Sequence, residues 1–167
     1  MKKNFLILLA TLLTFTFVGC SDDDDDKASI GITGKNFNID KTFEVTAKDN
    51  NAIVIVDITS TEGIKNLWVT INSPVLPDAV LAAVGLVPKF DLANPGELSV
   101  PLTGIGLLKA GEVIKGSKAT QFNVSAFMPM IAAFGKQGPH KFQLKVVDKA
   151  GNSLEKVLTI NFPNLAK

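Results

Sequence analysis

Three side chains that often carry chemistry occur once each in this chain of 167 residues: Cys20, Trp68 and His140. A catalytic His140 would need a nucleophile and an orienting acid within reach. The sequence has no Gly-x-Ser-x-Gly elbow, and a single histidine cannot build a zinc site of the usual composition. We therefore expect no catalytic residue, no metal site and no cofactor, and interpret His140 as the start of a strand after Gly138-Pro139.

Acidic residues offer two further possibilities. Asp148 and Asn152 bracket a turn and could ligate calcium, but calcium takes six to eight oxygen ligands. We expect both side chains to bond the amides of the turn instead. The other acids outside 22–26 are scattered, which is typical of a solvated surface, although spacing alone leaves a carboxylate pair for glycoside hydrolysis open. These acids are Asp40, Glu44, Asp49, Asp57, Glu62, Asp78, Asp91, Glu97, Glu112 and Glu155.

Trp68 is the one aromatic candidate for ligand contact. Leu67, Val69 and Ile71 alternate as one face of a strand, so Trp68 is predicted to point outward. An outward indole could stack on a sugar ring, or it could be covered by the apolar segment 75–87. We favour the cover, because one tryptophan and no tyrosine make a poor sugar platform.

The first nineteen residues are predicted to be a cleaved signal peptide. Lys2 and Lys3 precede an uncharged apolar run over 5–13, and mostly small or apolar residues follow to Gly19. A membrane-spanning helix needs about 20 apolar residues, and this run is shorter.

The end of that segment, Phe17-Val18-Gly19-Cys20, resembles a bacterial lipobox, with phenylalanine where leucine is usual. The resemblance implies cleavage between Gly19 and Cys20, a diacylglyceryl thioether on Cys20, and attachment to a membrane through that lipid. The alternative is a free or pairing thiol in an ordinary secreted protein. Cys20 is the only cysteine, so an internal disulfide is impossible.

The lipid-bearing cysteine is followed by an acidic tether within residues 20–28, which is too charged to bury. It comprises Ser21, Asp22, Asp23, Asp24, Asp25 and Asp26. This run resembles the acidic stretch of surface-exposed lipoproteins of Bacteroidetes, which implies an outer-membrane location facing the cell exterior. The alternative is a simple solvated spacer.

Composition bounds the remaining chain. Cleavage after Gly19 leaves 148 residues, enough for one domain, which we place at 29–167. All 17 basic residues are lysines, and loss of Lys2 and Lys3 takes the formal net charge from +1 to −1. A nucleic-acid partner is therefore not expected.

Alternating apolar residues predict strands over 36–47 and 67–71, with a turn at 49–51. A nearly continuous, β-branched run predicts a central strand over 52–58. Alternation at 141–146 and 154–162, around the reversal at 148–152, predicts a β-hairpin.

The middle of the chain, 74–117, is proline-rich and irregular. Within it we expect a short helix at 78–84 and an edge strand at 98–102. After it we expect a strand at 121–124 and a helix capped by Ser125 and ending at Gly135. The apolar residues of the middle segment form either a second small core, which we favour, or a surface for a partner. They are Val75, Leu76, Val80, Leu81, Val84, Leu86, Val87, Ile105, Leu107 and Leu108.

These elements predict an all-β protein. The segment 138–152, of the form H-x-F-x-L-x-V-x-D-x-x-G-N from His140 onward, is similar to the closing hairpin of bacterial immunoglobulin-like modules. The resemblance implies an immunoglobulin-like β-sandwich with a partly helical, proline-rich insertion and without the cysteine pair of antibody domains. The function expected is a non-catalytic cell-surface module for binding or assembly, with an outer-membrane protein or a glycan as partner. The runner-up is a glycan-binding accessory lipoprotein of a polysaccharide-uptake system, and a hydrolase is a remote alternative.

Overall fold

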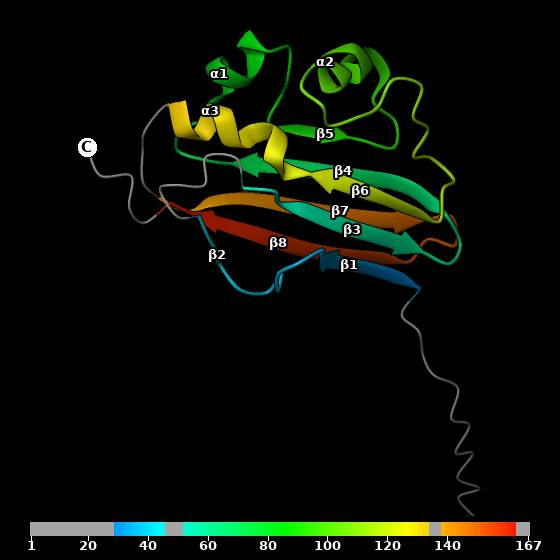
Figure 1. Cartoon of the computed structure of the whole chain (residues 1–167). Helices are drawn as coiled ribbons and strands as arrows, with labels where there is room; N and C mark the ends of the chain where they lie inside the picture. Colours follow the sequence, from blue (N-terminus) through cyan, green and yellow to red (C-terminus); the bar gives the residue numbers. More distant parts are fainter. Residues whose placement is uncertain (1–28, 46–51, 134–137, 163–167) are drawn as a thin grey trace, which may run out of the picture.

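The computed structural model describes residues 29–45, 52–133 and 138–162. The signal segment, Cys20, the acidic tether and the predicted turn at 49–51 lie outside these residues. One sheet has three strands in the order β1 (Ile30–Gly34), β3 (Ile55–Ser60) and β6 (Ala119–Asn123). The other has five, in the order β2 (Phe43–Glu44), β8 (Ser153–Asn161), β7 (His140–Asp148), β4 (Ile64–Asn72) and β5 (Lys89–Asp91) (Figure 1). The predicted all-β class is confirmed.

The pairing of β4 with β7 forms the centre of the five-stranded sheet. The register places Leu67 opposite Val146, Val69 opposite Leu144, and Ile71 opposite Phe142. All six side chains are buried, while the residues between them point to the other face. β8 then pairs with β7 through the reversal at 149–152, so the predicted closing hairpin and the predicted third strand are both confirmed.

The two sheets face each other across one core. The ring of Phe122 on β6 lies 6.2 Å from that of Phe142 on β7, measured between centroids. Val56 and Ile58 on β3 are fully buried and belong to the same cluster. Burial of each such side chain contributes about 1.5–3 kcal/mol, so the sheets are held together mainly by apolar contact.

Short helices cover one end of this core. They are α1 (Asp78–Ala83), the 3₁₀ helix η1 (Gly96–Leu98), α2 (Ser99–Gly104), the 3₁₀ helix η2 (Val124–Phe127) and α3 (Met128–Ala133) (Figure 1). Leu81, Leu102 and Ile131 are buried by them. Most apolar residues of the middle segment are also buried or half-buried, although Val87 is 43% exposed. The core role is therefore confirmed, but these residues belong to the same cluster as the sheet residues and not to a second small core.

The predicted edge strand at 98–102 is wrong, because this segment is helical. Pro101 lies in the first turn of α2, where its missing N–H leaves no helix hydrogen bond unmade. Thr103 extends the turn by donating its hydroxyl to the Ser99 carbonyl at 2.8 Å. The helix predicted at 78–84 is confirmed as α1.

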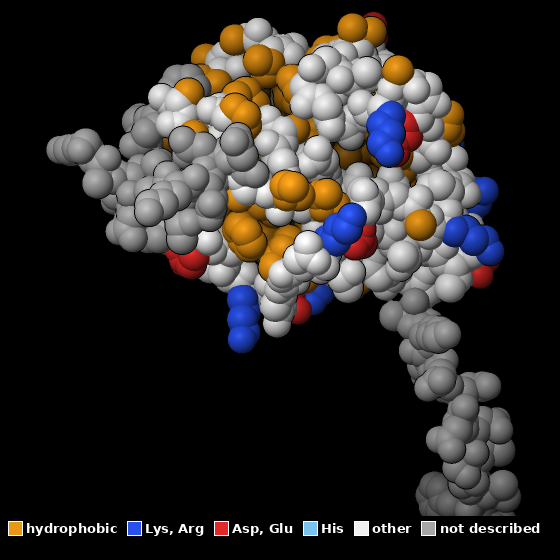
Figure 2. All heavy atoms as spheres, viewed as in Figure 1, with side chains coloured by type: hydrophobic (Ala, Val, Ile, Leu, Met, Phe, Trp, Pro, Cys, Tyr) orange, Lys and Arg blue, Asp and Glu red, His pale blue; other side chains and the backbone are white. Residues whose placement is uncertain are grey.

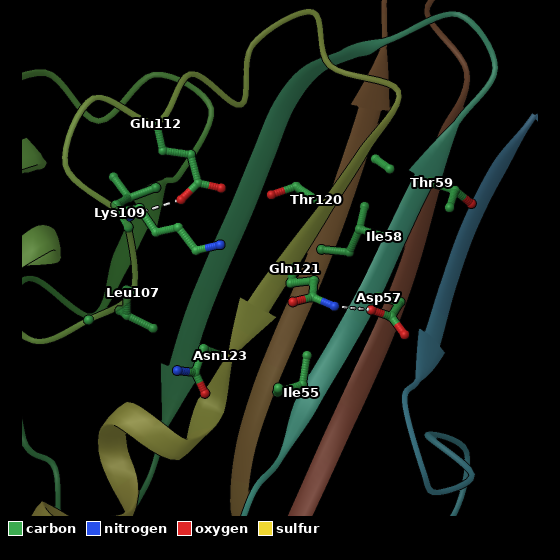
Figure 3. A pocket seen from close by; sticks show the side chains of 13 residues that line it. Ile55, Asp57, Ile58, Thr59, Leu107, Lys109, Glu112, Thr120, Gln121 and Asn123 are labelled. Atoms are coloured by element: carbon green, nitrogen blue, oxygen red, sulfur yellow. Dashed lines mark hydrogen bonds between the residues drawn. The ribbon is translucent and has the colours of Figure 1, made fainter.

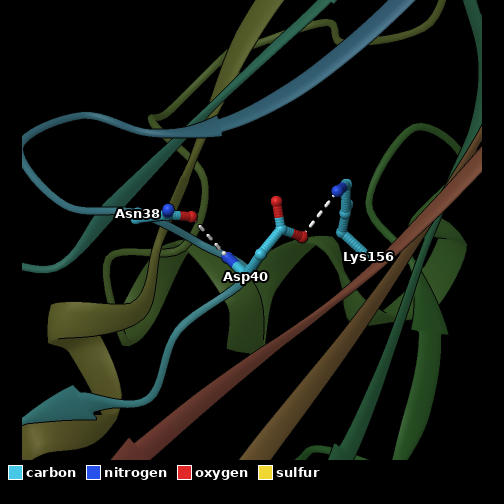
Figure 4. A network of polar contacts seen from close by, with 3 residues as sticks. All are labelled: Asn38, Asp40 and Lys156. Carbon is cyan, nitrogen blue, oxygen red and sulfur yellow. Dashed lines mark hydrogen bonds and ion pairs between the residues drawn. The ribbon is translucent and has the colours of Figure 1, made fainter.

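The predicted strand over 36–47 is also wrong, because within its described part, 36–45, only Phe43–Glu44 forms a strand. The chain crosses from one sheet to the other over 35–42, so its alternating apolar residues serve two different surfaces. Asp40 stabilises the crossing through an ion pair with Lys156 on β8 at 2.5 Å, and its N–H donates to Asn38 Oδ1 at 2.9 Å (Figure 4).

Ser125 is not the helix cap that the sequence predicted. Its Oγ accepts the N–H of Val54 at 2.8 Å, and it lies inside η2 instead of preceding it. The predicted strand 52–58 accordingly begins later, at Ile55, because the chain at Val54 is bonded to this helical segment. The predicted helix end at Gly135 lies outside the described residues.

Asp91, one of the acids predicted to be solvated, is buried. Asp91 is 8% exposed, and its Oδ1 accepts the N–H groups of Leu67 and Ala93, both at 2.9 Å. Its Oδ2 accepts the side-chain amides of Asn66 at 2.6 Å and Asn94 at 2.7 Å. This carboxylate therefore joins β4 to the end of β5. Asp148 is fully buried as well.

Replacement of Asp91 by alanine should lower the free energy of unfolding by about 2–4 kcal/mol, because two buried N–H groups lose their acceptor. Asp40→Ala, which removes an exposed ion pair, should change stability by about 1 kcal/mol or less. Urea unfolding of both variants measures the difference. Equal effects of the two substitutions would show that Asp91 does not hold β5 in place.

Candidate binding site

A hollow with a volume of about 520 Å³ opens over β3 and β6 beside the loop 106–112 (Figure 3). We call it the β6 hollow. Its walls come from β3, from β6 and from the loop. The lining residues are Ile55, Asp57, Ile58, Thr59, Gly106, Leu107, Leu108, Lys109, Glu112, Ala119, Thr120, Gln121 and Asn123. Viewed from the side of β6, the molecule exposes hydrophobic side chains with lysines and acids beside them (Figure 2).

The loop wall of the hollow is fixed by hydrogen bonds. The N–H groups of Leu107 and Leu108 both donate to the Leu102 carbonyl, at 2.9 and 3.2 Å, and both leucine side chains are buried. Glu112 Oε2 accepts the Lys109 N–H at 2.9 Å, and the Glu112 N–H donates back to the Lys109 carbonyl. The hollow is thus largely preformed, as ligand sites usually are.

The strand wall carries polar groups with spare hydrogen-bonding capacity. Thr120 Oγ1 and Asn123 Oδ1 are buried, and neither has a hydrogen-bond partner among the described residues. A buried polar atom without a partner costs about 1–3 kcal/mol. Asp57, by contrast, accepts the side-chain amide of Gln121 at 2.8 Å (Figure 3). These two oxygens have almost no accessible surface, so the polar side chains that the hollow itself offers are those of Asp57, Lys109, Glu112 and Gln121.

Trp68 points outward, as predicted, and lines a smaller hollow of about 320 Å³ on the outer face of the five-stranded sheet. The other lining residues are Thr70, Lys89, Gln143, Lys145, Val147 and Glu155. Lys89 Nζ lies 5.4 Å from the centre of the indole ring, and Gln143 donates to Glu155 at 2.6 Å. The predicted cover of Trp68 by the segment 75–87 is therefore wrong, because the residue over the ring is Lys89. The buried apolar side chains of 75–87 belong to the core.

His140 begins β7, as the sequence predicted, and has no exposed surface. Its Nδ1 lies 2.8 Å from Ser73 Oγ, and its ring meets the edge of Phe162 at 5.5 Å. Burial lowers the pKa of His140 below its ordinary value of 6.5, which keeps the imidazole neutral at physiological pH. The structural interpretation of His140 is confirmed by this sealed position.

Asp148 and Asn152 bond within the hairpin turn, which confirms the structural interpretation. Asp148 Oδ1 accepts the Asn152 N–H, and Oδ2 accepts the Asn152 side-chain amide, both at 2.8 Å. Burial alone would raise the pKa of Asp148, but the hydrogen bonds from Asn152, Gly151 and Ala150 together lower it below 3.8. The carboxylate is therefore ionised, and both of its oxygens already accept hydrogen bonds within the turn.

Among the described residues, no three histidine, cysteine, aspartate or glutamate side chains come together in a way that could hold a metal ion. Within the same residues, every helix is too short or too polar to cross a membrane. Searches against protein-family models, curated proteins and solved structures find no match for this chain.

The β6 hollow was missed by the sequence reasoning, which placed 121–124 only as a short strand. The sequence shows that Leu107 and Leu108 are apolar. It does not show that their loop lies alongside a strand that begins more than ten residues later. The alternation of polar Gln121 and Asn123 with buried Phe122 is the one signal that this strand has a polar outer face.

Stability should fall between pH 7 and pH 5 because the unfolded chain protonates His140 near pH 6.5, whereas the folded chain resists protonation. Each unit by which burial lowers this pKa contributes about 1.4 kcal/mol to the loss. Thermal unfolding across this range measures it. His140→Asn, which places an amide near Ser73 without a titrating group, should be less stable but much flatter in its pH dependence. An equally steep pH profile in this variant would assign the loss of stability to other titrating groups. Asp148 is not one of them, because its lowered pKa lies below this pH range.

Proposed function

We propose that this chain is a lipid-anchored, non-catalytic binding or assembly module of a bacterial cell surface. The observation that carries the proposal is the β6 hollow. Its volume of about 520 Å³ lies within the usual range of ligand sites, about 300–1,000 Å³. Leucines and the polar side chains of Lys109, Glu112 and Gln121 line it, and this mixture suits recognition of a partner or ligand.

The strand order supports an immunoglobulin-like sandwich. In immunoglobulin domains, strands A, B and E share one sheet, and C, F and G share the other. Here the order β1-β3-β6 is the same as the order of A, B and E, and the order β8-β7-β4 is the same as that of G, F and C. β5 extends the second sheet beside β4, as the extra strand of variable-type domains does.

The anchor is supported by sequence alone. Phe17 to Cys20 resemble a lipobox, and the aspartates at 22–26 resemble the tether of surface-exposed lipoproteins. Two or more acyl chains suffice for stable attachment to a membrane. We therefore propose an outer-membrane location with the 29–167 region facing the cell exterior.

A non-catalytic role is supported by the engagement of the groups that could do chemistry. His140 is sealed in the core, and Asp148 and Asp91 are bonded within the fold. In the β6 hollow, Asp57 and Glu112 each accept a hydrogen bond from their own surroundings. Binding requires only complementary surface, and the hollow offers that.

A photo-crosslinking amino acid at position 121 should form an adduct with a membrane-fraction partner in cells, whereas the same group at Lys141, on the outer face of the other sheet, should not. Cys20→Ser should release the chain from the membrane fraction and abolish the adduct. Immunoblotting detects the adduct and the release from the membrane fraction, and mass spectrometry detects the acyl chains on Cys20. Adducts at both positions, or at neither, would count against the hollow as the binding site.

The second candidate function is glycan binding at Trp68. The observation in its favour is that Trp68 lies among Gln143, Lys145 and Glu155, whose polar atoms could meet sugar hydroxyls. Lys89 occupies the ring face, however, and must move for a sugar to stack.

If Trp68 stacks on sugars, polysaccharide titration should shift its fluorescence, and Lys89→Ala should raise the affinity about threefold or more by freeing the ring face. Trp68 is the only tryptophan, so the signal reports this face alone. Gln121→Val, in the β6 hollow, is the matched control and should leave the titration unchanged. No fluorescence change with neutral or acidic polysaccharides would remove this candidate.

A further inference from the structure

We propose that the β6 hollow accepts an extended polypeptide segment, which adds to the three-stranded sheet as a fourth strand along β6. This inference rests on the proposed function and specifies its ligand as a strand of a partner protein. Strand addition of this kind draws its affinity from main-chain hydrogen bonds and its selectivity from alternate side chains.

The hydrogen-bonding pattern shows which groups of β6 are directed outward. β6 is a terminal strand of its sheet, and β3 is its neighbour. Next to the ladder, the Val124 N–H donates to the Val54 carbonyl, and the Ser60 N–H donates to the Lys118 carbonyl. In an antiparallel pair, hydrogen-bonded and non-hydrogen-bonded positions alternate. Even-numbered residues of β6 therefore bond β3, and the odd-numbered residues turn their main-chain groups away from it.

The outward groups belong to Ala119, Gln121 and Asn123. The Ala119 carbonyl accepts the Ser117 hydroxyl at 3.2 Å, so it is already engaged. Among the described residues, the main-chain groups of Gln121 and Asn123 form no hydrogen bond outside the strand ladder. An incoming strand would find donors and acceptors at the spacing of two residues that strand pairing requires.

The β6 hollow lies along this same edge. Ala119, Gln121 and Asn123 are all among its lining residues, and the loop with Leu107 stands opposite them (Figure 3). Neighbouring strands lie about 4.8 Å apart, so an added strand would lie between β6 and the loop. Its side chains on one face would approach Leu107 of the loop.

The sheet itself has a place for this strand. The corresponding immunoglobulin sheet has four strands, A, B, E and D, with D beside E. Here the described chain supplies three strands. The loop 106–112 lies on the side of β6 where D would be, but it does not pair with β6, and the hollow remains beside them. A partner strand would complete the sheet at this position.

Recognition through the main chain gives the ligand a definite chemistry. Because Asp57 and Glu112 are already hydrogen-bonded, the hollow favours a segment with short apolar or β-branched side chains at alternate positions over a charged one. The probe for the test is the peptide acetyl-Lys-Thr-Val-Thr-Val-Thr-Lys-amide.

Amide hydrogen exchange of the mature chain, followed by NMR, tests the geometry directly. Saturating peptide should slow exchange of the Gln121 and Asn123 amides about tenfold or more, because those amides become hydrogen-bonded. The Thr120 and Phe122 amides already bond β3 and should change little. Protection of Trp68 and its neighbours in place of β6 would overturn the proposal.

A pair of variants at one position separates main chain from side chain. Gln121→Pro removes the outward N–H while sparing the bonds to β3, and proline is tolerated on edge strands. It should weaken peptide binding about fivefold to tenfold, the loss of one or two main-chain hydrogen bonds. Gln121→Val also loses the side-chain amide that bonds Asp57 but keeps the N–H, so it should bind the peptide about fivefold to tenfold more tightly than Gln121→Pro. Circular dichroism and the melting temperature confirm that both variants fold.

The peptide itself supplies a control that does not depend on protein folding. Methylation of every second peptide nitrogen blocks one edge of the peptide, and methylation of the alternate set blocks the other edge. One set should abolish binding, and the other should not. Equal binding by both methylated peptides, or edge-to-edge dimers of the chain without peptide in light scattering, would overturn strand addition. An adduct at position 121 in cells without peptide binding would retain the proposed function and reject this ligand.

Discussion

The contact between β7 and the opposite sheet is the interaction on which the rest of the structure depends. Phe142 on β7 meets Phe122 of β6 and, at 5.2 Å between ring centroids, Phe127 of η2. All three rings are fully buried. Because Phe122 faces inward, Gln121 and Asn123 on either side of it must face outward. The orientation of the candidate binding edge is therefore fixed by the apolar core behind it.

The closing hairpin and β4 could be predicted because each uses one simple repeat over many residues. Phe142, Leu144 and Val146 need only face one core, and the turn at 148–152 carries its own glycine and Asp–Asn bonds. Region 36–47 has the same repeat but a different outcome. Its apolar residues serve first one sheet and then the other, and a period of two does not reveal that the chain changes partner between them.

The remaining errors concern polar side chains whose partners are distant in sequence. Ser125 was predicted to cap a helix, but its acceptor oxygen is used by Val54, seventy-one residues earlier. Asp91 was predicted to be solvated, but it accepts hydrogen bonds from Leu67 and Asn66 across the β4–β5 pair. Local sequence gives the chemistry of such groups and not their neighbours, so a buried carboxylate and a surface one look alike before folding.

The same difficulty explains why the sequence pointed to Trp68 as a candidate for ligand contact but did not point to the edge of β6. Trp68 was conspicuous because its residue type suggests a ligand, yet Lys89 covers its ring. The β6 edge was inconspicuous because its main-chain groups have no sequence signature. An exposed sheet edge invites indiscriminate pairing, and proteins usually shorten it, charge it or cover it. Here β6 has five residues, and the nearby loop shields it without filling the space beside it. Such an edge admits a single strand that fits between β6 and the loop, while the loop itself obstructs the approach of a whole second sheet.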